Sequence, residues 1–227
     1  HGSAAPATAV FDLQVPGRPE ASTMDWFARL GYDTWCVDCE CFGRSDKVRP
    51  IDASVSNGAE DLASASEQVM RVTGQRPLLY GVGAGALRAG LFAQRHPDRV
   101  RRLALDMVTG LLAQDNPEAI DPAVLQAFTT AALAADASAP SGAPADTSLG
   151  VLDAGRISAP TLLMRGEHGG VASEDELADF FARLPNADKQ LASMPGVGHT
   201  STLSKNWALV YHLLDGFLSQ PPPAYTG

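Results

Sequence analysis

The sequence predicts an α/β protein in which helices cover both faces of a mostly parallel sheet. Short runs rich in β-branched and aromatic residues alternate with helical segments, which is the pattern of such a sheet. With 227 residues, 45% of them hydrophobic, the chain can bury one large core, so we expect a single domain over residues 1–227. The predicted strands are residues 32–38, 77–82, 100–107, 160–166 and 189–196.

Two of the predicted helices begin with the spacing of a capping box, in which two side chains satisfy free backbone N–H groups. Asn57 precedes Glu60 by three residues, and Ser173 precedes Glu176 in the same way. Four apolar residues after Asn57 predict one buried stripe on the first of these helices: Leu62, Ala65, Val69 and Val72.

Glycine and proline mark the remaining boundaries. A helix over residues 22–30 is expected to end at Gly31, because glycine tolerates the left-handed turn after a helix. Residues 110–156 interrupt the alternation, with one helix over 121–135 and then a run rich in Ala, Ser, Pro and Gly, so we predict a lid insertion there. Residues 220–227 are expected to form an extended tail.

Charge and hydropathy exclude two classes of partner. The net charge of -9 and the absence of a basic run argue against a nucleic-acid partner. No stretch approaches the ~20 consecutive apolar residues of a membrane span, and the first residues lack the pattern of a signal peptide, so we expect a cytoplasmic protein. Cys36, Cys39 and Cys41 are too few and too close for a disulfide framework or a zinc site, and no metal or cofactor is expected.

The stretch "RPLLYGVGAGALRAG" at 76–90 carries a glycine-rich turn with two interpretations. Read as Gly81-x-Gly83-x-x-Ala86, it matches the NAD(P)-binding turn of a Rossmann fold, with Asp106 placed to bind a ribose hydroxyl. Read as Gly81-x-Gly83-x-Gly85, it matches the turn that carries the nucleophile of a hydrolase, with glycine in place of the nucleophile.

Further motifs favour the second interpretation, and from its first residue to about residue 219 the chain resembles the α/β-hydrolase family. The resemblance implies an oxyanion hole near Gly2, Ser3 and the N–H of Ala84, and it places the triad histidine at His199. The motifs that carry it occur in the order of the family: "HGSAAPATAVFDL", "GYDTWCVDCECFGRSDK", "GVGAG", "HPDRVRRLAL", "APTLLMRGEHGG" and "MPGVGHTS".

Two members of the catalytic triad are absent by the same comparison. Gly83 stands where the family has its serine, and Gly169 stands where it has the acid, so the serine mechanism cannot operate. An oxyanion hole with His199 as base suits reactions through an enolate, and we expect a lyase, cyclase or isomerase acting on a mostly apolar carbonyl compound. Asp106 is the first candidate to orient His199, and Glu167 is the second.

The sequence leaves three alternatives besides a Rossmann protein. One is a pseudo-hydrolase that binds a ligand or partner without catalysis, and another is an esterase silenced at Gly83. The third is that a thiolate of Cys39 or Cys41 replaces the serine. In addition, the family has strands before the His-Gly loop, so an uncovered sheet edge is expected, closed by a second copy, by another chain, or by a longer precursor of this chain.

Overall fold

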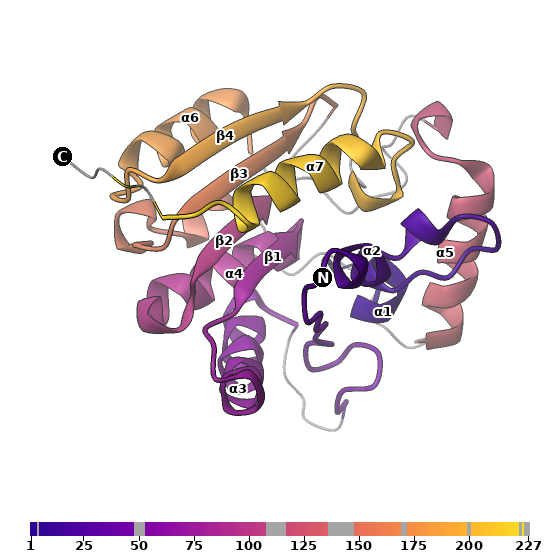
Figure 1. The fold of residues 1–227 in the computed structure, drawn as a ribbon, viewed down its shortest axis with the longest axis horizontal. Coiled ribbons are helices and arrows are strands. Elements are labelled where there is room, and N and C mark those ends of the chain that lie inside the picture. The colour runs from indigo at the N-terminus through magenta and orange to yellow at the C-terminus, as the bar shows by residue number, and fades with distance from the viewer. Residues whose placement is uncertain are drawn as a thin grey trace.

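A parallel sheet of four strands forms the centre of the computed structural model, which describes residues 1–3, 5–47, 53–107, 117–135, 148–168, 172–198, 201–222 and 224. The strands lie side by side in chain order (Figure 1). Each of them falls within a predicted range, so the mostly parallel sheet is confirmed. They are β1 (Leu78–Val82), β2 (Arg102–Asp106), β3 (Thr161–Gly166) and β4 (Lys189–Met194).

Helices cover both faces of this sheet, as predicted. Alternate residues of a strand point to opposite faces, and in β2 Leu103 belongs to one buried cluster and Ala104 to the other. Helices α3, α4 and α6 pack in the first cluster, and α1, α2 and α7 in the second. The helices are α1 (Ala7–Phe11), α2 (Thr23–Arg29), α3 (Val55–Thr73), α4 (Ala84–Arg95), α5 (Pro122–Ala135), α6 (Glu174–Arg183) and α7 (Trp207–Leu218), with 3-10 turns at Pro19–Ala21, Pro97–Arg99, Pro117–Ala119, Leu149–Val151, Ala154–Arg156 and Ser201–Leu203.

The helix boundaries follow the predicted caps in two of three cases. Ser173 and Glu176 form the capping box of α6, and Gly31, with φ 94°, follows α2. The predicted cap at Asn57 is wrong, because α3 begins one turn earlier and the Ser54 hydroxyl accepts the Asn57 N–H at 3.2 Å. Ser54 is therefore the N-cap of α3, three residues before the predicted one.

The predicted buried stripe of α3 is also wrong. The face that α3 buries against α4 carries Val55, Gly58, Ala59, Ala63 and Ser66. Small residues are needed there, since a Cβ on Gly58 would lie 2.4 Å from Cδ of the Arg88 side chain. The stripe of Leu62, Ala65, Val69 and Val72 is only partly covered, and Val72 is 58% exposed.

Residues 32–38 are extended but do not form the predicted strand. A strand requires a neighbour for its backbone hydrogen bonds, and within the described residues β1 pairs with β2 alone. The segment instead lies across a cleft from β1, and both line that cleft.

The helix predicted within residues 110–156 is confirmed as α5, whose Val124 and Phe128 pack with Ala9 of α1 and with Leu13, which follows α1. Figure 1 shows α5 beside α1 and α2, away from β4. Residues 108–116 and 136–147 lie outside the described ranges, so the lid remains a prediction.

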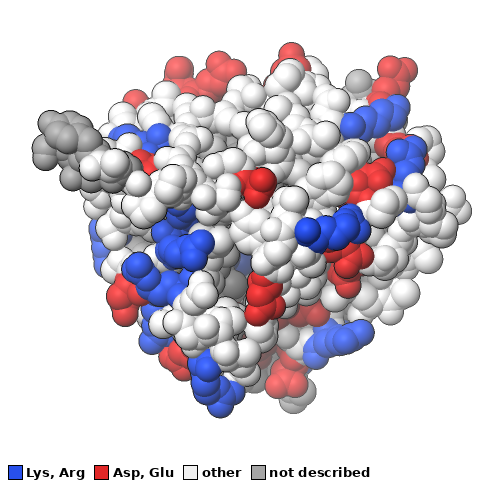
Figure 2. All heavy atoms as spheres, in the orientation of Figure 1, with Lys and Arg blue, Asp and Glu red and all other residues white. Residues whose placement is uncertain are grey.

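Two surface properties bear on possible partners. No helix in the described ranges combines the length and the apolar character needed to cross a membrane. Figure 2 shows Lys and Arg side chains interspersed with Asp and Glu over the face in view, so this face carries no continuous basic surface.

Candidate active site

Gly83 forms a sharp turn between β1 and α4, with φ 58° and ψ −124°. L-residues with side chains rarely adopt positive φ, so glycine takes this conformation without their steric cost. The Gly83 N–H donates to the carbonyl oxygen of Asp106 at 2.9 Å, which fixes the turn to the end of β2. Ala84 begins α4, and the first N–H groups of a helix have no acceptor within it. The turn therefore places the Ala84 N–H where the helix dipole favours a negative charge.

The glycines on either side of Gly83 are required by close packing. A Cβ on Gly81 would lie 2.4 Å from the carbonyl oxygen of Gly85, and a Cβ on Gly85 would lie 2.5 Å from the carbonyl oxygen of His1. Neither backbone oxygen can move away cheaply, so both positions exclude a side chain. The spacing of the glycines thus follows from contacts between backbones and does not need a bound phosphate.

The first residues of the chain lie against this turn. Gly2 is next to Val82, since a Cβ on it would meet the Val82 carbonyl oxygen at 3.5 Å. The Arg88 side chain holds the His1 carbonyl oxygen with an Nη1 hydrogen bond of 3.1 Å. Gly2 is therefore beside the turn that begins at Gly83 and leads into Ala84, and Ser3 follows Gly2 in the chain.

Asp106 is a buried carboxylate at the end of β2, with no exposed surface. Its Oδ2 accepts hydrogen bonds from the Tyr80 hydroxyl, at 2.9 Å, and from the Ser201 hydroxyl. Ser201, the second of these donors, follows the expected base His199 by two residues in the chain. The register Tyr80↔Ala104 puts Tyr80 diagonal to Asp106 on one face of the sheet.

Tyr80 and Ser201 are site residues that the sequence analysis did not identify. Tyr80 could have been found from the sequence. The parallel strands β1 and β2 end at Val82 and Asp106, and Tyr80, two residues before Val82, lies on the same face of the sheet as Asp106. Ser201 had no such signal, since it belongs to a 3-10 turn after the last strand.

Burial raises the pKa of three tyrosines, of which Tyr80 belongs to the candidate site. Burial and then Asp106 raise the pKa of Tyr80 well above 10.0. Burial raises the pKa of Tyr211 to about 12, and burial with Asp215 raises that of Tyr32 to about 12. Because the unfolded chain loses these protons first, their contribution to stability is complete below pH 10.0 and is lost as the pH rises through the folded values.

An alkaline titration checks these three pKa values. We expect phenolate absorbance at pH 11 to report little ionisation of Tyr32, Tyr80 and Tyr211 until the chain unfolds, and then to rise sharply. Tyr80→Phe should reduce the size of that late rise. Full ionisation at pH 11 of a chain that circular dichroism shows to be folded would contradict the burial of these hydroxyls.

Glu167, the second candidate acid, has a different environment. Its side chain is 53% exposed, and its Oε2 accepts the Gly196 N–H at 2.8 Å in the turn after β4. His168 is also exposed, with its Nε2 3.8 Å from the same carboxylate. Glu167 therefore stabilises a surface turn, while Asp106 is the candidate that is buried and hydrogen-bonded to neighbouring side chains.

His199 and Gly169 lie outside the described residues, so the base and the vacant acid position remain predictions from the sequence. The described residues of the predicted site are Gly2, Ser3, Gly83, Ala84, Asp106 and Glu167. Gly2, Gly83, Ala84 and Asp106 meet at the carboxyl ends of β1 and β2, which is the edge where α/β sheets bind ligands.

The three cysteines differ in burial, and Cys36 and Cys41 are partly covered. All three are free, Cys39 is buried, and burial raises the pKa of Cys36. Cys41 adopts φ 73°, and its N–H donates to the Asp46 carbonyl oxygen. Among the described residues, no group of three or more His, Cys, Asp or Glu side chains is arranged to hold a metal ion.

The geometry also argues against a dinucleotide at the glycine turn. The His1 backbone lies on Gly85, where a pyrophosphate would need to approach the start of α4. The Asp106 carboxylate faces Tyr80 and Ser201 inside the protein and does not present an oxygen to a ribose.

Comparison with solved structures identifies the architecture. No protein-family model and no curated protein matches the sequence. E-2-(acetamidomethylene)succinate hydrolase superimposes with a TM-score of 0.67 at 20% identity, over 97% of this chain and 90% of that one. A hydrolase from Pseudomonas aeruginosa superimposes with a TM-score of 0.64 at 20% identity, over 86% of this chain and 84% of that one. For a meta-cleavage product hydrolase from Pseudomonas fluorescens the TM-score is 0.62 at 18% identity, over 95% of this chain and 88% of that one.

Proposed function

We propose that this chain, which has the α/β-hydrolase fold, is a lyase, cyclase or isomerase that acts on a carbonyl compound without a serine nucleophile. The observation that carries this proposal is the turn at Gly83. It combines the backbone conformation of a nucleophile turn, with φ 58°, and a residue that has no side chain to act as nucleophile. The donors that stabilise an oxyanion do not depend on that side chain.

Each retained group has a role in enolate chemistry. His199 takes the proton from the carbon next to the carbonyl, and the electron pair of that C–H bond moves into the enolate, with the charge on oxygen. The N–H of Ala84 and an N–H at Gly2 or Ser3 stabilise this oxygen. Return of the proton at another carbon gives an isomer, and attack of the enolate carbon on a second carbonyl group closes a ring.

Asp106 positions the base in this proposal. A buried carboxylate fixes one tautomer of a histidine and stabilises the imidazolium that forms when the histidine takes a proton. The hydrogen bonds from Tyr80 and Ser201 hold the Asp106 side chain in place.

We propose a reducing compartment such as the cytoplasm, and the free thiols support this location. Three free cysteines within six residues would be prone to oxidation in a secreted protein.

Exchange of carbon-bound protons with D₂O tests the proposal without knowledge of the natural substrate. We expect a panel of ketones, thioesters and 1,3-dicarbonyl compounds to include members whose α-protons exchange faster with the protein than without it, measured by NMR. His199→Ala should abolish the acceleration. His212→Ala is the matched control, because His212 is exposed on α7, and it should have no effect.

Two outcomes would replace the proposal. Unchanged exchange in His199→Ala would exclude His199 as the base. Compounds that raise the melting temperature without any exchange or turnover would support a pseudo-hydrolase, which the absence of a nucleophile at Gly83 also suits.

A further inference from the structure

Arg88 of α4 is a buried cation that has no carboxylate partner among the described residues. It is 1% exposed, and its Nη1 and Nη2 donate to the carbonyl oxygens of His1 and Ala53, each at 3.1 Å. No ion pair in the described part of the chain includes it, whereas the buried Arg102 is paired with Asp188. Arginine keeps its proton in proteins, and a buried charge without a counter-ion is costly. A group that breaks this rule points to a function.

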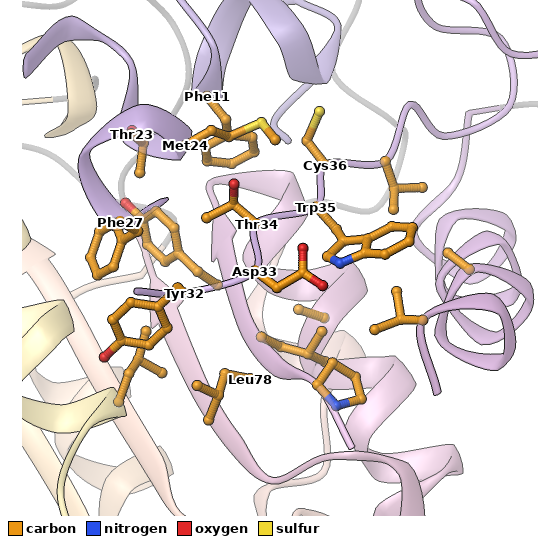
Figure 3. A pocket seen from close by; sticks show the side chains of 18 of the residues that line it. Phe11, Thr23, Met24, Phe27, Tyr32, Asp33, Thr34, Trp35, Cys36 and Leu78 are labelled. Atoms are coloured by element: carbon orange, nitrogen blue, oxygen red, sulfur yellow. The ribbon is translucent and has the colours of Figure 1, made fainter. Parts of the chain in front are cut away.

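The neighbours of Arg88 hold its side chain in one place. Its Cδ lies against α3, where a Cβ on Gly58 would come within 2.4 Å of it. The guanidinium lies over the Phe42 ring, with Cζ 5.4 Å from the ring centroid. Arg88 also lines the cleft of about 960 Å³ beside β1, whose walls Figure 3 shows, but so little of the side chain is exposed that the cleft hardly hydrates its charge.

The peptide group between His1 and Gly2 is fixed by this arginine. Its carbonyl oxygen lies between the Arg88 guanidinium and Gly85, where even a Cβ would be only 2.5 Å from the oxygen. In a planar trans peptide the C=O and the N–H point in opposite directions. The Gly2 N–H therefore points away from Arg88, and the hydrogen bond to the carbonyl oxygen sets its direction.

The N–H groups of Gly2 and Ser3 are available as donors. Neither has an acceptor among the described residues, and both residues are partly exposed. The Gly2 carbonyl oxygen accepts from Nδ1 of the His1 ring at 2.6 Å, so the peptide that carries the Ser3 N–H is held as well. Free N–H groups in fixed peptides are what the stabilisation of an oxyanion requires.

The charge of Arg88 lies where a negative group offsets its cost. Arg88 follows Ala84 by four residues, and helix side chains lean toward the N-terminus, so the guanidinium lies beside the first turn of α4. The helix dipole is positive at this end and disfavours a cation there. A charge-assisted hydrogen bond also polarises the peptide that accepts it, which makes the Gly2 N–H a stronger donor. Negative charge that develops beside this N–H is stabilised by all three effects.

We propose that Arg88 is a positioning residue of the oxyanion hole, which acts through the His1–Gly2 peptide and without contact with the substrate. It aims and polarises the Gly2 N–H, so that this donor is in place before the oxygen becomes negative. This role rests on the enolate chemistry proposed above, because the oxygen that Gly2 stabilises is the enolate oxygen.

Arg88→Met tests the role in the exchange reaction. We expect the rate at saturating substrate to fall about 10²-fold with little change in KM, because a misplaced donor affects the transition state more than the bound ketone. Arg88→Lys keeps a charged donor for the His1 carbonyl oxygen and should recover part of the rate. Arg95→Met is the matched control. Arg95 also joins α4 to α3, through Ser56 and Glu60, but from the far end of α4, so its loss should leave the rate unchanged.

Backbone NMR relaxation gives a second measurement, which does not depend on activity. The order parameter of the Gly2 amide should be near about 0.85 in the unaltered chain and below about 0.6 in Arg88→Met. Arg88→Gln keeps an amide donor without the charge, and it replaces Arg88→Met if that variant does not fold. It should lower the rate as well, because the peptide is no longer polarised by a charge.

The outcomes separate this role from the proposed function. A folded Arg88→Met or Arg88→Gln variant with an unchanged rate and an unchanged Gly2 order parameter would overturn the role of Arg88 and leave the enolate chemistry in place. A higher KM with an unchanged rate at saturation would overturn it in favour of contact between Arg88 and the substrate. Exchange of no compound, even with the unaltered chain, would overturn the enolate chemistry, while the Gly2 order parameter would still decide whether Arg88 fixes the peptide.

Discussion

Asp106→Asn is expected to lower the rate of α-proton exchange by about 10²- to 10⁴-fold, the usual contribution of positioned acid–base catalysis. The asparagine is neutral, so it no longer stabilises an imidazolium at His199. It also offers one carbonyl oxygen in place of a carboxylate that accepts from Tyr80 and Ser201. We expect a loss of stability of about 1 to 3 kcal/mol from imperfectly paired donors.

Glu167→Gln is the comparison that assigns the orienting acid. The Glu167 carboxylate is 53% exposed and holds the turn at Gly196, so its replacement should leave exchange unchanged. The two variants are compared by NMR exchange rates, with thermal unfolding as a check on the fold. A large loss in Glu167→Gln together with full activity in Asp106→Asn would reverse the assignment.

Arg102→Met is expected to reduce the free energy of unfolding by about 3 to 5 kcal/mol, because it leaves a buried charge without its partner. Arg102 Nη2 lies 2.6 Å from Asp188 Oδ2, and the two side chains are 6% and 7% exposed. The guanidinium also lies over the Phe217 ring, 4.8 Å from its centroid. Urea denaturation measures the loss.

A surface pair of the same length provides the control. Arg165 Nη1 and Glu174 Oε1 are also 2.6 Å apart, but the Glu174 side chain is 76% exposed. Arg165→Met should therefore cost no more than about 1 kcal/mol. Replacing Asp188 with leucine in the Arg102→Met background should recover part of the stability, because no charge remains buried. Equal losses in Arg102→Met and Arg165→Met would show that burial does not strengthen the first pair.

Local signals in the sequence were sufficient for most of the sheet and for the caps of two helices. The apolar runs of β1 to β4 and the capping box at Ser173 do not depend on distant residues, and both were predicted correctly. Residues 32–38 have the composition of a strand, yet strand formation depends on a hydrogen-bonded neighbour that composition cannot supply. The α3 stripe failed for a related reason, since its apolar residues face the cleft beside β1.

The candidate site was predictable where it depends on backbone turns. The positive φ of Gly83 and the start of α4 at Ala84 follow from the glycine spacing. The direction of the Asp106 side chain could not be predicted from the sequence, because a shift of one residue in β2 would have turned it to the other face of the sheet. The observed register, Val82↔Asp106, fixes it beside Tyr80.

The central claim is that Gly83 holds the nucleophile position of a carbonyl site that keeps its oxyanion donors and His199 as base. Gly83→Ser tests it most directly, with a fluorophosphonate as the reagent and mass spectrometry of the labelled peptide as the measurement. The substitution costs about 1 to 3 kcal/mol of backbone strain, so circular dichroism must first show a folded chain. We predict an adduct at position 83 that is absent from the unaltered chain and lost when His199→Ala is added. A folded Gly83→Ser variant that forms no adduct would contradict the claim.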